Sequence, residues 1–301
     1  LLEEMGRHML PGPYFSTVVM GGMSIMEAGT EDQKQEYLPR IAEGQIIVTL
    51  ALNEPSGRWD AEGIQLTADK SGDGYVLNGT KLFVPNAHVS DNLVVAARTG
   101  EEDTDISLFI VSSQAKGVTQ NLLKTIASDR QSEVVFEKVE VPSSALLGEK
   151  NAGWATIEKV LQWGAIGKCA EMSGGGQEVL DMTVEYAKQR TQFGRPIGTF
   201  QAIQHHCANM ATDVEGAKFI TYQAAWKLSE GLPAEREVAM AKAWVSEAYR
   251  RVCALGHQSH GAIGFTKEHN MQLYSRRAKA AELAFGDADL HLEKVAEIIG
   301  L

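Results

Sequence analysis

The spacing of apolar residues changes twice along the chain, and these changes limit the folds it can adopt. Residues 1–45 have a helical pattern, with an N-cap predicted at Thr30. Residues 46–147 alternate apolar and polar side chains as strands do, and residues 148–301 return to a helical period. Turn signals at 72–74 and at Asn78–Gly79 divide the middle segment. The order of elements predicts an α+β chain: helices, a small antiparallel β domain, and then several long helices.

The composition argues against several kinds of binding partner and site. The formal charge of −11 argues against a nucleic-acid-binding surface, and no apolar run has the length that spans a bilayer. The first residues are acidic and lack the basic segment of a signal peptide. We expect no metal site, reduced thiols and a cytoplasmic protein, because three cysteines lie far apart without ligand spacing: Cys169, Cys207 and Cys253.

Two glycine-containing stretches interrupt helical runs in the last third of the chain. The first, QRTQFGRPIGTFQAIQHH, begins at Gln189 and carries Arg190 beside an aromatic residue and two glycines. An arginine there can hold a diphosphate through paired hydrogen bonds, but the stretch taken alone favours a plain turn between two helices with Arg190 as a solvated cation. The second, SGGGQ, lies at 173–177 inside a helical pattern, which favours close helix packing over a phosphate loop.

Six segments together resemble the acyl-CoA dehydrogenase family and follow its order along nearly the whole chain. They are EEMGR…PGPY, EDQKQEYLPRIAEGQIIVTLALNEP, ADKSGDGYVLNGTKLFVPNA, VFEKVEVPSSALLG, YAKQRTQFGRPIGTFQAIQHHCANM and HQSHGAIGFTKE. The resemblance implies an N-terminal helical domain at 1–45, present in part, a middle antiparallel β-barrel domain at 46–147, and a C-terminal four-helix bundle at 148–301. It also implies bound FAD and oxidation of an acyl-CoA at its α,β carbons.

The resemblance assigns two segments to the nucleotide end of FAD: the stretch at 189–206 described above, and a further segment at 258–265. In the family, this end reaches in from a neighbouring subunit. The residues matched to it are Arg190, Gln192 and Phe193 at the bend, Ile197, Phe200 and Ile203 on the adenine side, and Gln258, Ser259, Gly261 and Ala262 around the pyrophosphate.

The residues matched to the flavin ring depart from the family pattern. Asn53 replaces a threonine in the segment NEPSGRWD, and Trp59 stands where a small serine is usual. In the following strand, Phe83 replaces the usual tryptophan and Pro85 the usual threonine, which removes a backbone donor. Four substitutions in one pocket predict that this chain does not seat its own flavin ring.

Both positions that carry the catalytic base in this family lack a carboxylate. The position before the C-terminal glycine falls on Phe285, and the alternative position on the first bundle helix falls on Gly164. Glu282 and Glu171 are the nearest acids that could replace the base. Glu171 lies two helical turns, about 11 Å, from Gly164, so we expect both acids to be salt-bridge residues.

These observations support one hypothesis and leave two alternatives. The hypothesis is a non-catalytic subunit that clasps FAD in a hetero-oligomeric acyl-CoA dehydrogenase, as in bacterial enzymes for bulky substrates such as steroid side chains. Its expected partners are a homologous catalytic subunit in a hetero-tetramer, an acyl-CoA and an electron-transfer flavoprotein. The alternatives are a self-sufficient homo-oligomeric dehydrogenase with a relocated glutamate base and a non-enzymatic scaffold or binding protein of the same fold.

Overall fold

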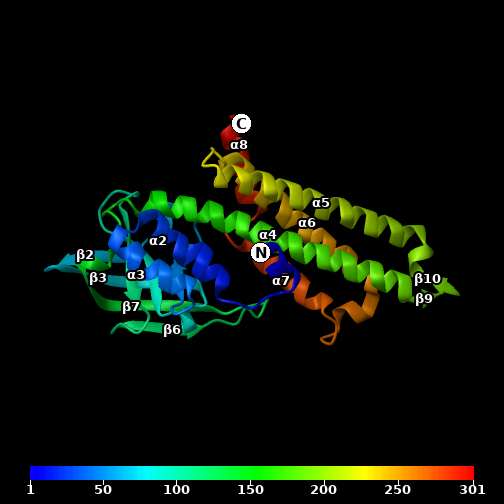
Figure 1. Ribbon diagram of the computed structural model, residues 1–301, viewed down its shortest axis with the longest axis horizontal. Coiled ribbons are helices and arrows are strands. Elements are labelled where there is room, and N and C mark those ends of the chain that lie inside the picture. The colour runs from blue at the N-terminus through cyan, green and yellow to red at the C-terminus, as the bar shows by residue number, and fades with distance from the viewer. The chain divides into compact units, whose positions relative to one another are not determined.

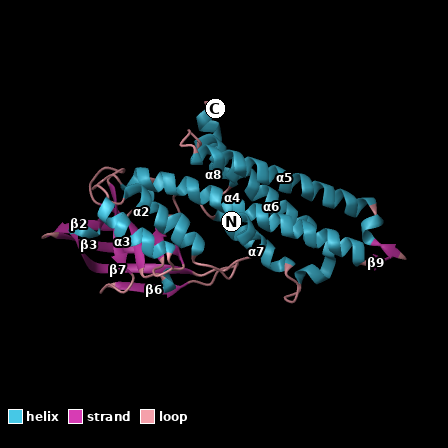
Figure 2. Cartoon of the chain, in the orientation of Figure 1, coloured by secondary structure: helices cyan, strands magenta, loops and turns pink.

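The computed structural model describes residues 1–301 and divides them into two compact units. The sheet unit is formed by residues 12–161, and the helical unit by residues 1–11 together with 162–301. Figure 1 follows the chain through both units, and Figure 2 shows that the large sheet belongs to the sheet unit. Each unit is described separately below.

The sheet unit begins with three short helices, and the sequence encodes the start of the third. They are η1 (Phe15–Gly22), α2 (Met23–Ala28) and α3 (Glu31–Ala42). The predicted N-cap is confirmed, because Thr30 Oγ1 accepts from the Gln33 amide at 3.2 Å and Gln33 Oε1 accepts from the Thr30 amide at 3.0 Å. This reciprocal capping box satisfies two amides that the first turn leaves without a partner.

Eight strands form the sheet, in the order β6-β7-β3-β2-β4-β5-β8, with β1 added beside β4. Their bounds are β1 (Val48–Ala51), β2 (Thr67–Ser71), β3 (Gly74–Pro85), β4 (Asn92–Arg98), β5 (Ile106–Ser112), β6 (Val118–Leu122), β7 (Gln131–Pro142) and β8 (Leu146–Leu147), and short helical turns lie at η2 (Ala61–Gly63), η3 (Ala87–Val89) and η4 (Ser143–Ala145). Most neighbouring strands are antiparallel, as expected, but β1 and β2 each pair with β4 in parallel.

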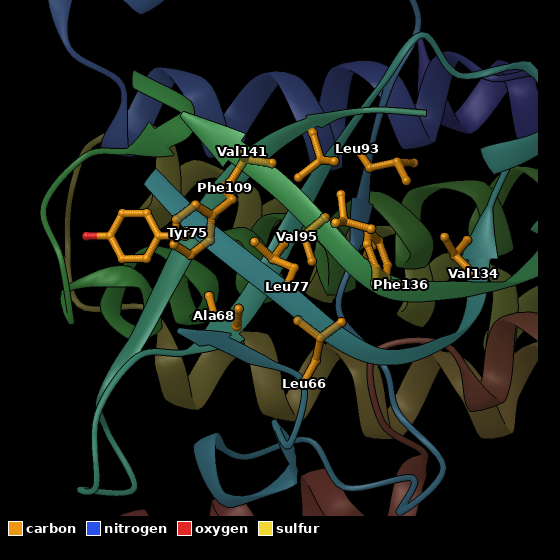
Figure 3. Close-up of a cluster of buried hydrophobic side chains, with 14 of the residues drawn as sticks. Leu66, Ala68, Tyr75, Leu77, Leu93, Val95, Phe109, Val134, Phe136 and Val141 are labelled. Atoms are coloured by element: carbon orange, nitrogen blue, oxygen red, sulfur yellow. The ribbon is translucent and has the colours of Figure 1, made fainter. Parts of the chain in front are cut away.

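The alternating residues of these strands build one apolar core. Leu66, Leu77, Phe109 and Phe136 are almost completely buried, and their side chains gather in the interior of the sheet unit (Figure 3). The rings of Tyr75 and Phe109 meet edge to face with centroids 5.0 Å apart. This geometry is favourable for aromatic pairs and adds to the burial of apolar area.

The Asn78–Gly79 pair was wrongly predicted as a turn. Both residues lie inside β3, at a shift of register between Leu77 and Gly79. Gly79 has φ +144°, and a Cβ there would lie 2.8 Å from the Cα of Leu66. The glycine is therefore required by a β-bulge and by close approach of another backbone segment, and both requirements give the same local sequence signal as a hairpin turn.

A buried ion pair links the loop after β1 to β3. Lys81 is completely buried, and its Nζ donates to Glu54 Oε1 at 2.6 Å and to the Leu52 carbonyl at 3.1 Å. The Glu54 carboxylate also accepts from the amides of Gln65 and Leu66. Burial lowers the pKa of Lys81 to about 8, although the Glu54 carboxylate opposes this shift. Because water cannot replace either partner of this buried ion pair, the pair fixes the path of the loop that carries Asn53.

We predict that Glu54→Ala lowers the unfolding free energy by about 3–5 kcal/mol, because it leaves a buried ammonium group and two amides without their acceptor. Urea denaturation would measure the change. The matched control is Glu27→Ala, which removes a pair with Lys159, whose side chain is 64% exposed. The control should cost less than about 1 kcal/mol. Equal losses in the two variants would contradict the assignment.

The helical unit consists of long helices and one small hairpin. Its elements are α1 (Leu2–Arg7), α4 (Gly153–Gln189, shared with the sheet unit), β9 (Thr191–Gln192), β10 (Arg195–Pro196), η5 (Ile197–Thr199), α5 (Gln201–Ser229), α6 (Glu235–His260), η6 (Gly261–Phe265), α7 (Met271–Leu283) and α8 (Ala288–Ile299). Helix α6 packs against α5, α7 and α8, so that it forms the centre of the unit. Figure 1 shows α5 and α6 running side by side.

Two of the three glycines of SGGGQ, Gly174 and Gly175, allow neighbouring segments to approach α4, in agreement with the predicted packing role. A Cβ at Gly174 would lie 1.8 Å from the Glu3 carbonyl oxygen of α1. A Cβ at Gly175 would lie 2.4 Å from the Tyr249 hydroxyl of α6. Larger residues would therefore separate these helices, and the glycines contribute packing space at the expense of helix propensity.

Candidate functional site

The two positions matched to the family's catalytic base lie against each other in the helical unit. Gly164 is on α4, and Phe285 is in the connection between α7 and α8. A Cβ at Gly164 would lie 2.3 Å from Cε1 of Phe285, so the aromatic ring covers this glycine directly. Phe285 is only 8% exposed. An apolar ring thus fills the space beside Gly164, and neither residue can accept a proton.

Side chains of α6 and α8 bind main-chain carbonyls at the end of α7 and in the α7–α8 connection. Lys242 Nζ on α6 donates to the carbonyls of Glu282 at 2.9 Å and Gly286 at 2.7 Å. His291 Nε2 on α8 lies 2.9 Å from the Phe285 carbonyl oxygen, which makes the ring nitrogen the donor. Burial lowers the pKa of Lys242 to about 8 and that of His291 to about 4.

The two acids that could replace the base are both engaged in ion pairs within their own helices. Glu282 Oε1 accepts from Lys279 Nζ at 3.1 Å, while its Oε2 is buried without a hydrogen-bond partner. Glu171 Oε2 lies 2.5 Å from Lys168 Nζ. Pairing of i and i+3 residues is typical of acids that stabilise a helix.

The hairpin between α4 and α5 presents a cation and an aromatic ring to solvent. Phe193 and Gly194 have φ of +53° and +78°, which is the backbone of a tight two-residue turn between β9 and β10. Phe193 is 92% exposed. Arg190 is exposed, and its guanidinium has no hydrogen bond or ion pair within the chain. Its five donors remain free for an anion, and the doubly charged pyrophosphate of FAD fits that need.

Arg195 has a different role from Arg190. Its guanidinium lies 4.3 Å from the centre of the Phe200 ring, and the Phe193 ring meets Phe200 edge to face. Cation–π contact therefore stabilises the hairpin from within. Gln192 is exposed, and the residues matched to the adenine side are half-buried at the base of the hairpin: Ile197, Phe200 and Ile203.

The second matched segment ends α6. Gln258, Gly261 and Ala262 are exposed, and Gly261 has φ +65°, a backbone conformation that favours glycine. Ser259 differs from the other three, because it is buried and its hydroxyl donates to the Leu255 carbonyl at 2.8 Å. The solvent-facing part of this segment is therefore Gln258, Gly261 and Ala262, while Ser259 is used within the bundle.

Two buried histidines, His257 and His260, pack beside this segment. His257 stacks on Phe265, and His260 stacks on Tyr186 with ring centroids 4.5 Å apart. His260 is buried and its Nδ1 lies 2.8 Å from the Gly256 carbonyl, so it is a packing residue. Burial lowers the pKa of both histidines, which favours neutral rings at physiological pH.

In the sheet unit, the positions matched to the flavin ring have unusual geometry. The Asn53 carbonyl accepts from the Leu82 amide at 2.8 Å, so that the loop lies beside the end of β3. Phe83 has φ +53° and is 53% exposed, at a register shift between Lys81 and Val84. Pro85, the last residue of β3, cannot donate a backbone hydrogen bond to a flavin.

Three buried residues of these sites were missed at the sequence level. Lys81, Lys242 and His291 carry little local signal, because a lysine or histidine in an amphipathic segment is normally assigned to the surface. Lys81 follows the Asn-Gly-Thr segment and Lys242 lies in an alanine-rich helix. These three residues could have been recognised as buried polar groups that need a partner only if the sequence pattern had placed each of them on the buried face of its helix or strand.

Comparison with known proteins agrees with the architecture. Family models of the acyl-CoA dehydrogenase N-terminal, middle and C-terminal domains match residues 1–45, 49–139 and 151–300. A 3-(aryl)acrylate reductase of Clostridium sporogenes is 35% identical over 98% of this chain and 80% of its own length. A subunit of the caffeyl-CoA reductase–Etf complex of Acetobacterium woodii is 35% identical over 90% of this chain and 73% of its own.

Solved structures give the same result. Butyryl-CoA dehydrogenase from Megasphaera elsdenii superposes with a TM-score of 0.95 at 31% identity and covers 100% of this chain and 80% of that one. An FAD complex of PigA superposes with a TM-score of 0.94 at 26% identity, over 100% of this chain and 81% of that one. The fold and motifs define an FAD-dependent oxidoreductase. The chain belongs to the acyl-CoA dehydrogenase family.

The family's cofactor fits this chain only in part. The unpaired Arg190 and the exposed hairpin suit the anionic, nucleotide end of FAD. Gly164 and Phe285 offer no proton acceptor, and none of the described residues forms a cluster that could hold a metal ion. No helix in the chain combines the length and hydrophobicity needed to cross a bilayer.

We predict that Gly164→Ala lowers the unfolding free energy by about 1–3 kcal/mol, because the new methyl group would overlap the ring of Phe285. The control is Gly176→Ala on the same helix, where a Cβ would meet Val214 Cγ2 at an ordinary 3.5 Å. That change should stabilise the helix by up to about 1 kcal/mol. Combined with Phe285→Leu, the first variant should regain stability and the second should not change. Denaturant titration of the wild type, the three single variants and the two double variants would decide.

We also predict that acidification from pH 6.5 to 4 destabilises the helical unit partly through His291. Its folded pKa, about 4, lies below the ordinary value of 6.5, so the unfolded chain binds the proton more readily in this window. The contribution is complete above pH 6.5 and is lost towards pH 4, with an upper size of about 3 kcal/mol. The unfolding free energy of His291→Gln should therefore depend less steeply on pH, whereas that of His205→Gln, at an exposed site, should follow the wild type.

Proposed function

We propose that this chain is the non-catalytic, FAD-clasping subunit of a hetero-oligomeric acyl-CoA dehydrogenase that acts on the α,β bond of an acyl-CoA thioester. The contact of Phe285 with Gly164 carries the proposal, because both base positions are occupied by groups that cannot take a proton. A homologous subunit would supply the missing carboxylate, the flavin pocket and the acyl pocket.

The clasp would act through charge and shape. Arg190 would donate paired hydrogen bonds to the pyrophosphate of an FAD seated in the partner subunit, with Gln192 and Phe193 beside it. Ile197, Phe200 and Ile203 would line the adenine side, and the exposed edge formed by Gln258, Gly261 and Ala262 would meet the pyrophosphate from α6. Ser259 would hold that edge through its buried hydrogen bond. When bound, FAD supplies the acceptor for the hydride that leaves the β carbon.

Names of relatives bear on the substrate and the electron acceptor. Two relatives are named as reductases of arylacrylate and caffeyl-CoA, and the second is named as part of an Etf complex. They favour a bulky acyl substrate, as in fatty-acid or steroid side-chain β-oxidation, and an electron-transfer flavoprotein as acceptor. A hetero-tetramer with the catalytic homologue, in the cytoplasm, completes the proposal.

Two other functions make different demands on the chain. A self-sufficient homo-oligomer would need Glu282 or Glu171 as its base, and both are ion-paired within a helix. A scaffold or binding protein of the same fold would need no flavin at all, and the exposed, unpaired Arg190 would then have no ligand. Neither alternative accounts for both the contact between Phe285 and Gly164 and the unpaired guanidinium of Arg190.

Co-purification separates the three functions. We expect the chain to purify with a homologous dehydrogenase at one FAD per two unlike chains, and substrate to bleach that flavin. One FAD per chain in a preparation of this protein alone, bleached by an acyl-CoA and abolished by Glu282→Gln or Glu171→Gln, would establish the self-sufficient enzyme. Absence of flavin from the co-purified complex would establish the scaffold.

Within the complex, we predict that Arg190→Ala weakens FAD retention about 10- to 100-fold, the loss expected for a charge-assisted hydrogen-bonding group. Equilibrium dialysis of released FAD would measure it. The control is Lys188→Ala, which removes a neighbouring exposed cation already paired with Glu185. Equal weakening by both variants would indicate general electrostatic attraction and not a clasp formed by Arg190.

A further inference from the structure

Three main-chain carbonyls, one at the end of α7 and two in the α7–α8 connection, are bound by side chains of α6 and α8. Lys242 Nζ on α6 donates to Glu282 O at 2.9 Å and to Gly286 O at 2.7 Å. His291 on α8 binds Phe285 O at 2.9 Å. The third Lys242 proton is directed to Ser246 Oγ at 3.0 Å, so that the ammonium group is fully hydrogen-bonded although it is completely buried.

Capping of α7 explains only one of these bonds. The helix ends at Leu283, and Glu282 O is one of the terminal carbonyls that a helix leaves without a partner and that a cation stabilises. The carbonyls of Phe285 and Gly286 lie beyond the helix. These two residues have φ of +61° and +88°, a conformation that a phenylalanine adopts only at a cost. The two outer bonds therefore fix the strained pair and not the helix end.

We infer that Lys242 and His291 are positioning residues that form a carbonyl clamp, which holds residue 285 against Gly164 whatever side chain it carries. All three bonds to the connection end on main-chain oxygens, so none depends on the phenylalanine ring. The inference rests on the proposed function only in treating position 285 as the base position of the family. The chain has then lost the base but has kept the main-chain support that aims residue 285 at α4.

A thiol at position 285 reports on the clamp. The background is Phe285→Cys with Cys207→Ser, because the remaining native thiols, Cys169 and Cys253, are buried. The probe is the rate of reaction of the full folded chain with 5,5′-dithiobis(2-nitrobenzoate). With the clamp intact, we expect the introduced thiol to react at least about 100-fold more slowly than in the urea-unfolded chain, because it must wait for local opening.

Breaking either arm should release the connection selectively. Lys242→Met and His291→Leu should each accelerate labelling by at least about tenfold, the effect of losing a hydrogen bond to a charged or buried group. His291→Gln should restore slow labelling, because an amide N–H can still donate to the carbonyl of residue 285. The control is Lys279→Met, which removes the partner of the Glu282 side chain but leaves the main-chain bonds intact, and it should not change the rate.

The inference is overturned if Lys242→Met and His291→Leu label within twofold of the intact clamp while circular dichroism shows them folded. It is also overturned if Lys279→Met accelerates labelling as much as they do, because the whole of α7 would then be loosening. If Lys242→Met does not fold, the comparison of His291→Leu with His291→Gln decides alone. The flavin count of the complex is independent of this measurement, so failure of the clamp and failure of the proposed function are distinguished.

Discussion

The contact between the Phe285 ring and Gly164 is the constraint on which the chemistry of this chain depends. It joins the two positions that the sequence resemblance matches to the family's catalytic base, and an aromatic ring fills the space between them. Proton abstraction from an α carbon needs a carboxylate within hydrogen-bond reach of that proton. Glu282 and Glu171, the nearby acids, are held by lysines of their own helices. The helical unit is thus closely packed at the two positions that the sequence resemblance matches to the base.

The opposite end of α4 has the reverse character. The hairpin after it exposes Phe193 almost completely and leaves Arg190 without a partner in the chain. An exposed phenylalanine leaves apolar area in water, and aromatic and arginine side chains are enriched where surfaces bind. A filled base position and an open nucleotide clasp in one unit are the two properties expected of a subunit that serves a neighbour's cofactor.

Sequence reasoning recovered the order of elements, the Thr30 cap and the packing role of Gly174 and Gly175. It failed at Asn78–Gly79, because a β-bulge and a hairpin turn both require glycine and the local pattern does not distinguish them. It also missed Lys81, Lys242 and His291. Each of these residues is polar but buried in the fold, and each has main-chain carbonyls among its partners, which no motif encodes. The carbonyls that Lys81 and Lys242 bind belong to segments distant in the chain, whereas His291 binds a carbonyl in the connection just before its own helix.

The sequence by itself determined the order of helical and strand segments and the family to which the chain belongs. It also predicts a phenylalanine and a glycine at the positions of the base and an arginine with glycines at the clasp, because motif spacing is enough to predict the residue at a single position. Only the tertiary structure decided that Phe285 lies on Gly164, that Ser259 faces inward while Gln258 faces solvent, and that a buried lysine binds the connection. Such relations depend on which faces of distant helices meet, and packing sets them because each buried polar group must find a partner when water is removed.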